Sequence, residues 1–143
     1  MESLIKQPSH YMGCSELGKS LMIQAGLDNL LSSNFFDQEC FIFIEQIEQI
    51  NQNFFLGNCF KYLWRLGDKN NWNRYTKNKS VLMDLSKAVY YIKYYIHLQE
   101  SENNLIPHWI DRLSRVLDLH LTELKFFHYE SMFNIFLYDY TKV

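Results

Sequence analysis

Apolar residues recur at steps of three and four along much of this chain, which is the spacing of one face of an α-helix. From about Ser80 to Gln99 the expected buried stripe consists of Leu82, Leu85, Val89, Ile92 and Ile96. A second long pattern starts at Pro107, which suits the first turn of a helix, and continues toward Phe127 through Ile110, Leu113, Val116, Leu117, Leu121 and Leu124. No Asn-Gly or Asp-Gly hairpin turn interrupts these patterns. The sequence therefore predicts an all-α fold.

Three shorter helices are predicted before these two. The first runs from about Ser15 to Leu31, and the second from about Asp37 to Asn51, with Asp37 as its N-cap and an apolar register of Phe41, Ile44 and Ile47. The third covers Gly57 to Leu66, with Phe60, Leu63 and Trp64 toward the core and Gly67 as its C-cap. We expect an exposed loop from Asp68 to Lys79, Ser80 as the cap of the fourth helix, and a linker from Glu100 to Asn104. Together these segments predict a compact bundle of about five helices.

The chain has 143 residues, of which 48% are hydrophobic and 17% aromatic, enough for one well-packed domain. We expect a helical domain over residues 1–100 and a C-terminal helical extension over 101–143 that packs on it or forms an interface. Aromatic residues are dense in two segments: Tyr90, Tyr91, Tyr94 and Tyr95, then Phe126, Phe127, Tyr129, Phe133, Phe136, Tyr138 and Tyr140. Two interpretations stay open, namely self-association into a homo-oligomer and completion of the bundle core.

Charge and cysteine content narrow the possible partners and compartment. The net charge of -2 argues against general nucleic-acid binding, yet six cations and one acid lie between Lys61 and Lys79, which favours a small phosphate anion as ligand. Three cysteines without a Cys-x-x-Cys pair fit reduced thiols in a cytoplasm. No apolar run has the length of a membrane span, so we expect no membrane partner.

Two helical faces carry the candidate chemistry. Asn58, Lys61, Tyr62 and Arg65 share one face of the third helix, and Asp84, Lys87, Ala88 and Tyr91 repeat the same spacing on the fourth. Side by side, the two helices would form one anion-binding surface, with Lys69 at the end of the first. The plainer interpretation is that Lys61, Arg65 and Asp84 form an ion pair between helices and that Lys87 is solvated.

Three ordered motifs carry a resemblance to a known family. They are Gln7-Pro8-Ser9-His10-Tyr11-Met12, the run Gly57-Asn58-x-x-Lys61-Tyr62-x-x-Arg65-x-Gly67-x-Lys69, and Asp84-Leu85-x-Lys87-Ala88-x-x-Tyr91. Together they resemble the SaV-like phage proteins, a family that includes a small phage nucleotide kinase, over roughly residues 7–95. The family's acidic helix corresponds here either to Ser15–Gly18 or to Glu39–Glu45.

The resemblance implies a phage-type nucleotide-binding protein, with a (deoxy)nucleoside monophosphate kinase that lacks a phosphate loop as the leading activity. Phosphoryl transfer needs cations and usually a Mg²⁺ ion held by carboxylates. Catalysis would then involve Lys61, Arg65, Asp84 and Lys87, and nucleotide binding would involve His10, Tyr11, Asn58, Tyr62, Lys69 and Tyr91.

Two other functions stay open at this point. One is a non-catalytic phage or mobile-element accessory protein that binds a host protein or sequesters a nucleotide against a defence system. The other is a Mg²⁺-dependent nucleotide pyrophosphohydrolase, in which Glu45 and Glu48 on one helix face join Asp84 around the metal.

Overall fold

The structure is a computed structural model that describes residues 13–29, 36–47, 50, 53–67 and 74–141, with side chains described outside 74–77 and 128–141. These residues form five α-helices and a short 3₁₀ turn, and they contain no strand, so the all-α prediction is confirmed. The elements are α1 (Glu16–Gln24), the turn η2 (Leu27–Asn29), α2 (Cys40–Gln46), α4 (Phe54–Trp64), α5 (Arg74–Ser101) and α6 (His108–Thr141).

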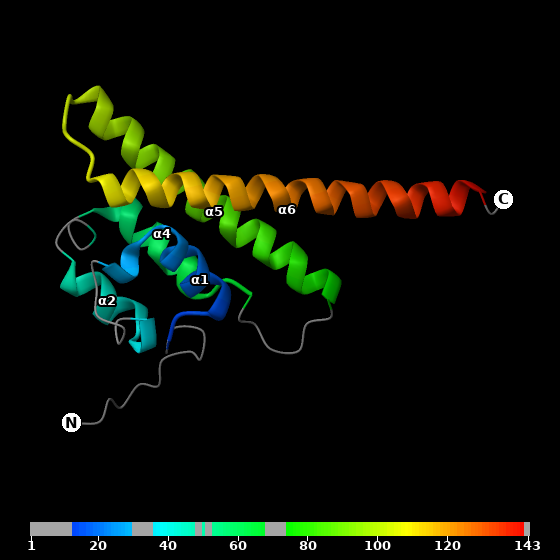
Figure 1. The fold of residues 1–143 in the computed structure, drawn as a ribbon, viewed down its shortest axis with the longest axis horizontal. Helices are drawn as coiled ribbons and strands as arrows, with labels where there is room; N and C mark the ends of the chain where they lie inside the picture. The colour runs from blue at the N-terminus through cyan, green and yellow to red at the C-terminus, as the bar shows by residue number, and fades with distance from the viewer. Residues whose placement is uncertain (1–12, 30–35, 48–49, 51–52, 68–73, 142–143) are drawn as a thin grey trace.

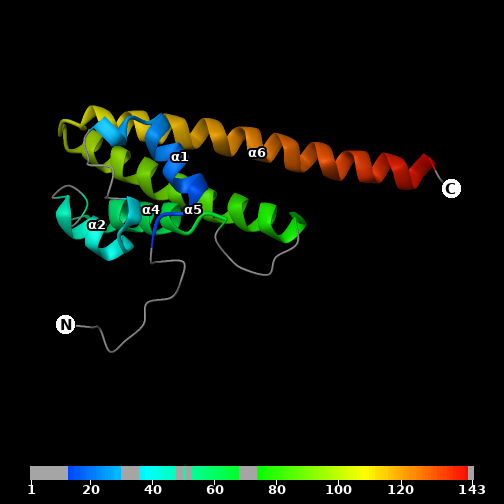
Figure 2. The ribbon, with the colours of Figure 1, turned by 60° about the horizontal axis from the view of Figure 1, so that its bottom comes forward.

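The long helix α5 is the centre of the arrangement, with α4 and the first half of α6 packed along it (Figure 1). Helix α1 packs on α6 and α4, and α2 packs on α4. Both ribbon views show that the second half of α6 extends beyond the other helices and ends far from them (Figures 1 and 2). Among the described residues no helix is both long enough and apolar enough to cross a membrane.

Aromatic packing between α2 and α4 holds the centre of the core. The rings of Phe43 and Trp64 are 4.4 Å apart at their centroids, and those of Phe43 and Phe60 are 5.3 Å apart. The indole of Trp64 also donates a 2.9 Å hydrogen bond to the carbonyl of Gln38, so its one polar atom is satisfied. The predicted core positions Phe60, Leu63 and Trp64 are all fully buried.

Helix α1 begins where the sequence predicts and ends earlier. The side chain of Ser15 accepts a hydrogen bond from the amide of Gly18, which makes Ser15 the N-cap. The helix ends at Gln24 rather than near Leu31, because Gly26 adopts a φ of 83°, in the left-handed region that terminates helices. Leu31 lies outside the described residues.

Helix α2 is shorter than predicted and buries a different face. Glu39 rather than Asp37 occupies the N-cap position, without a side-chain cap hydrogen bond, and Ile47 is extended at the other end. The buried residues are Cys40 and Phe43, whereas Phe41 of the predicted apolar register is exposed. The prediction failed because nearly every position of this segment is apolar, so that periodicity does not distinguish one face from another.

Helices α4 and α5 both start before their predicted positions. Asn53 caps α4 by accepting hydrogen bonds from the amides of Phe55 and Leu56. The loop prediction was wrong for residues 74–79, which belong to α5, so Ser80 lies inside that helix and is not its cap. No glycine or proline occurs from residue 74 to 101, and nothing in that stretch prevents an uninterrupted helix.

The predicted buried stripes of the two long helices are largely confirmed. Leu85, Val89 and Ile92 of α5 are buried, while Leu82 and Ile96 are half-buried. Helix α6 starts directly after Pro107 and contributes Ile110, Leu113, Leu117 and Leu121 to the same core. It continues to Thr141, so the segment beyond Phe127 extends one helix rather than forming a separate tail.

Candidate functional site

The candidate site lies where α4 and α5 run side by side. One face of α4 is buried through Leu56, Cys59, Phe60 and Leu63, which directs Tyr62 and Arg65 toward α5. On α5 the buried stripe places Asp84 against α4 and leaves Lys87 exposed one turn further along. The pairing of the two predicted runs on adjacent helices therefore follows from the burial of their apolar faces.

Arg65 and Asp84 form an ion pair across this helix contact. The guanidinium donates from Nη2 to Oδ1 at 3.3 Å and from Nε to Oδ2 at 3.4 Å, the two-pronged geometry typical of arginine with a carboxylate. Only 5% of the Asp84 side chain and 19% of the Arg65 side chain are exposed. A carboxylate buried to this degree needs a cationic partner, which Arg65 supplies.

Two cations lie close to the ring of Tyr62. The Tyr62 ring is stacked on that of Tyr91, with centroids 6.0 Å apart and planes within 10°. Arg65 Cζ and Lys87 Nζ each lie 5.2 Å from the centroid of the Tyr62 ring. Tyr62 comes from α4 and Arg65 is the C-cap residue of that helix, whereas Lys87 and Tyr91 come from α5, so this arrangement exists only when the two helices are packed.

The described charges near Tyr62 are mainly positive. Asp84 balances Arg65, whereas Lys87 makes no ion pair with any carboxylate in the described part of the chain. Among the described residues, Arg65 and Lys87 beside this ring and the single carboxylate of Asp84 leave one positive charge unbalanced. Such a site favours an anion such as a phosphate group.

Lys61 and Asn58 do not join this group. The charge of Lys61 acts on Cys40 of α2, where it opposes the effect of burial, which raises the pKa of the Cys40 thiol to about 12. Among the described residues Lys61 makes no ion pair and no cation–π contact with the Tyr62 ring. The amide of Asn58 donates a 2.8 Å hydrogen bond to the carbonyl of Phe54 in its own helix. The plainer interpretation of an ion pair between helices holds for Arg65 and Asp84.

The described residues do not form the predicted Mg²⁺ site. Asp84 is bound by Arg65, Glu45 is exposed on α2, and Glu48 lies outside the described residues. In the described part of the chain no three His, Cys, Asp or Glu side chains gather closely enough to hold a metal. His10, Tyr11 and Lys69 also lie outside the described residues.

Exposed aromatic rings extend the site along α5. Tyr90 is 62% exposed and stacks on Tyr94, with ring centroids 6.1 Å apart and planes within 16°. Phe54 of α4 is exposed and meets Tyr91 edge-on at 6.3 Å. Sequence reasoning noted the tyrosines but not Phe54, which stands at the predicted gap before α4. Its position beside Tyr91 depends on the contact between α4 and α5.

One segment of the sequence has the spacing of a phosphate loop, contrary to the expectation of a kinase without one. Gly13-Cys14-Ser15-Glu16-Leu17-Gly18-Lys19-Ser20 has the Gly-x-x-x-x-Gly-Lys-Ser spacing of a phosphate loop. In the structure the helix begins at Glu16, before the second glycine. The amide of Gly18 donates to the Ser15 side chain and that of Lys19 donates to the Ser15 carbonyl. Because these amides are already engaged, this segment does not have the geometry that cradles phosphates.

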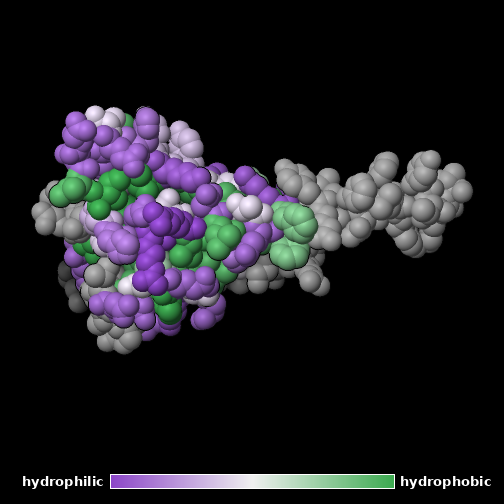
Figure 3. Space-filling model, turned by 45° about the horizontal axis from the view of Figure 1, so that its top comes forward, coloured by the Kyte–Doolittle hydropathy of each residue, from purple (hydrophilic) through white to green (hydrophobic). Residues whose placement is uncertain are grey.

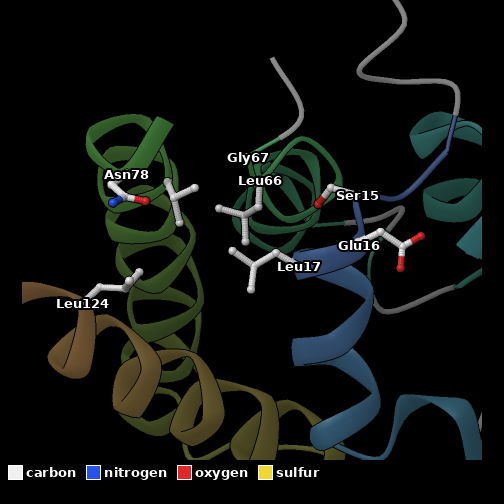
Figure 4. Close-up of a pocket in the computed structure, with 8 residues that line it drawn as sticks. Ser15, Glu16, Leu17, Leu66, Gly67, Asn78 and Leu124 are labelled. Atoms are coloured by element: carbon white, nitrogen blue, oxygen red, sulfur yellow. The ribbon is translucent and has the colours of Figure 1, made fainter. Parts of the chain in front are cut away.

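Helix packing, rather than phosphate binding, explains why position 18 is a glycine. A Cβ atom at this position would collide with the main-chain carbonyl oxygen of Leu63, where α1 crosses the end of α4. Beside this crossing lies a cavity of about 380 Å³ between α1, α4, α5 and α6. Leu17, Leu66 and Leu124 point toward it, whereas Glu16 points away (Figure 4). No pattern in the sequence indicates this cavity, because four separate elements line it.

Comparisons with protein-family models, with curated proteins and with solved structures give no match to this chain. The resemblance to SaV-like phage proteins therefore rests on the three sequence motifs alone.

Proposed function

We propose that this protein binds a nucleotide on the α4–α5 face, with the phosphate near Lys87 and Arg65. The observation that supports the proposal most directly is the placement of Arg65 Cζ and Lys87 Nζ at 5.2 Å from the same Tyr62 ring. A phosphate group at this edge would neutralise the excess positive charge and accept hydrogen bonds from both side chains.

The rings next to Lys87 suit the base of the same ligand. Tyr90 and Tyr91 follow Lys87 by three and four residues on α5, so both are one turn from its ammonium group. Nucleobases stack on exposed aromatic side chains with little dependence on sequence. A mononucleotide with its phosphate at Lys87 and its base against Tyr90 matches this arrangement of charge and aromatic surface.

Nucleoside monophosphate kinase activity is the specific reaction that the family resemblance supports. Arg65 and Lys87 would stabilise the negative charge of the transferred phosphoryl group, and Tyr62 would position both cations. The described residues do not form a Mg²⁺ site, so the roles proposed here belong to side chains alone. Asp84 acts in this proposal as a positioning residue, since its carboxylate holds Arg65.

Calorimetric titration tests the binding proposal. Purified protein would be titrated with a deoxynucleoside monophosphate and separately with inorganic phosphate, alongside the variants Lys87→Gln and Lys93→Gln. Both substitutions remove one charge from α5, but Lys93 pairs with Asp118 of α6 at 3.1 Å and lies away from Tyr62. We expect Lys87→Gln to weaken binding about tenfold or more, the loss of one charge-assisted hydrogen bond, while Lys93→Gln has little effect. Equal effects, or no binding by the unmodified protein, would refute the proposal.

A third variant separates this site from the segment with phosphate-loop spacing. Lys19→Gln should leave nucleotide affinity unchanged, because the helix geometry at Gly18 does not present a phosphate cradle. Loss of binding in Lys19→Gln with retention in Lys87→Gln would move the site to α1. Mass-spectrometric analysis of products formed from ATP, Mg²⁺ and a pool of deoxynucleoside monophosphates then distinguishes turnover from binding alone.

A second candidate function is that of an accessory protein that binds another protein without catalysis. The exposed rings of Phe54, Tyr90 and Tyr94 support it, since tyrosine and phenylalanine are enriched in protein interfaces. In the two assays above, this function predicts no nucleotide binding and an unchanged nucleotide pool. Pyrophosphate release that Glu45→Gln abolishes would instead indicate the pyrophosphohydrolase.

A further inference from the structure

A row of rings on α5 continues past the tyrosine against which the nucleotide base is proposed to lie. Four residues at steps of three and four share this face of the helix: Lys87, Tyr90, Tyr94 and His97. The centroid of the Tyr94 ring lies 6.1 Å from that of Tyr90 and 6.4 Å from that of His97. All three of these rings belong to exposed residues. The face therefore presents a cation followed by three accessible rings.

Phe55 of α4 supports the middle of this row. Its ring centroid is 4.8 Å from that of Tyr94 and 6.4 Å from that of Tyr91. Tyr94 thus packs on a half-buried ring while part of its own surface stays accessible. A ring held in this way loses little conformational freedom when a ligand stacks on it, which favours binding.

The row is longer than one nucleotide needs. At about 1.5 Å of rise per residue, Tyr90 lies about 4.5 Å along the helix from Lys87, whereas His97 lies about 15 Å from it. A mononucleotide with its phosphate at Lys87 and its base against Tyr90 leaves the rings of Tyr94 and His97 uncovered. Proteins bind single-stranded nucleic acids by stacking successive bases on aromatic side chains. The two uncovered rings therefore offer a stacking surface for a second base.

The charge of this face changes sign beyond His97. Glu100, in the last turn of α5, and Glu102, directly after the helix, are both exposed. Carboxylates repel phosphate groups, so a third nucleotide would meet an unfavourable charge. The net charge of -2 for the whole chain also disfavours a long strand. The surface that suits a nucleic acid therefore ends after about two bases.

We infer that the ligand of this face is a dinucleotide with a phosphate at its 5′ end. The terminal phosphate lies at Lys87, the first base against Tyr90, and the second base against Tyr94 and His97. The inference rests on the proposed function, because it uses the same position for the phosphate, and it adds the length of the ligand.

Calorimetric titration of the full chain with three 5′-phosphorylated thymidine ligands tests this length. They are the mononucleotide, the dinucleotide and the tetranucleotide. The dinucleotide should bind about tenfold or more tightly than the mononucleotide, which is the gain from stacking one further base, and the tetranucleotide should add little.

The outcomes separate this inference from the proposal of nucleotide binding. Equal affinities for the mononucleotide and the dinucleotide would overturn the inference and leave nucleotide binding intact. An affinity that rises again from the dinucleotide to the tetranucleotide by tenfold or more would overturn the two-nucleotide length and indicate a longer strand. Absence of binding by all three ligands would refute both proposals.

Tyr94→Leu locates the second base. This variant should lose the advantage of the dinucleotide yet keep the affinity for the mononucleotide, which also shows that it is folded. Phe126→Leu is the matched control, because Phe126 is 64% exposed on α6, and Figure 3 shows hydrophobic side chains on the surface where that helix leaves the body of the molecule. The control should bind both ligands like the unmodified chain.

A second variant guards against misfolding of Tyr94→Leu, since Tyr94 packs on Phe55. His97→Ala removes an exposed ring from the end of the row and should weaken dinucleotide binding several-fold, with the mononucleotide affinity unchanged. A dinucleotide advantage that survives in both variants would place the second base elsewhere and overturn the inference.

Discussion

Arg65, the C-cap residue of α4, donates two hydrogen bonds to Asp84 on α5, and this pair joins the two helices at the candidate site. The Asp84 side chain is almost fully removed from solvent, so the pair differs from an ordinary surface ion pair. Removal of the Arg65 side chain would leave the buried carboxylate of Asp84 without a compensating charge. The contact is therefore both a structural link and the element that orients Arg65 beside Tyr62.

The Arg65–Asp84 pair predicts a large loss of stability on truncation. Arg65→Ala should lower the free energy of unfolding by about 3–5 kcal/mol, because the Asp84 carboxylate would remain buried and unpaired. Lys93→Ala, which breaks the exposed Lys93–Asp118 pair, should cost at most about 1 kcal/mol. Urea denaturation of the two variants measures the difference. Similar losses in both would mean that burial adds nothing to the first pair.

The aromatic ring of Tyr62 predicts a contrast between two substitutions. Tyr62→Phe keeps the ring that lies beside Arg65 and Lys87, so nucleotide affinity should change little. Tyr62→Leu removes the ring and the two cation–π contacts, each worth about 0.5–1 kcal/mol at an exposed site, and should weaken binding several-fold. Calorimetric titration with a deoxynucleoside monophosphate gives both values. If the phenylalanine variant lost as much affinity as the leucine variant, the hydroxyl rather than the ring would be responsible.

Two glycines predict opposite responses to alanine. In Gly18→Ala the new methyl group would collide with the Leu63 carbonyl, so α1 must shift, at a cost of about 1–3 kcal/mol. In Gly57→Ala, inside α4, the nearest atom is the Ile50 carbonyl oxygen at 3.9 Å, an ordinary contact. This second variant should be stabilised by about 0.5–1 kcal/mol, because alanine favours helix more than glycine does. Thermal unfolding of both proteins checks the sign of each effect.

The buried thiols predict a loss of stability at alkaline pH. Burial raises the pKa of Cys40 from 9.0 to about 12 in the folded protein, and it raises the pKa of Cys59 as well. The folded state therefore keeps both thiols protonated at a pH where the unfolded chain releases those protons. Stability should be unaffected below about pH 9 and should fall between about pH 9 and 12, by up to roughly 1.4 kcal/mol per pH unit for each thiol.

Urea denaturation at a series of pH values from neutral to alkaline measures this dependence. Tyr95, whose pKa burial also raises, acts in the same direction once the pH exceeds the ordinary tyrosine value of 10.0. Replacement of Cys40 by alanine should reduce the slope above pH 9, even though the variant starts from lower stability because of the cavity it creates. An unchanged slope in Cys40→Ala would show that other groups dominate the alkaline transition.

The helical elements were predictable where burial and local pattern agree. Leu85, Val89 and Ile92 repeat at helical spacing in a segment without glycine or proline, and α5 forms there. Ser15 caps α1 as its residue type suggests. The boundaries of α2 were not predictable in the same way, because its run of apolar residues has no single polar face.

The candidate site was partly predictable. Asp84, Arg65 and Lys87 were expected on facing helices, and the structure brings all three to the contact between α4 and α5. Lys61 satisfied the same spacing rule, but in the described part of the chain it makes no cation–π contact with the Tyr62 ring. Spacing along a helix limits which residues share a side of it, yet a face wide enough for four residues can border two neighbouring helices at once.

The sequence by itself determined the helical character of this protein and the two charged runs, because both depend on residues close together along the chain. Tertiary structure decided which of those charges meet, why the Gly13–Ser20 segment does not cradle phosphate, and how far α6 extends past the other described helices. Those outcomes depend on contacts between distant segments, such as Gly18 with Leu63 and Lys87 with Tyr62. No local pattern encodes them, since each is set by how the buried faces of several helices pack together.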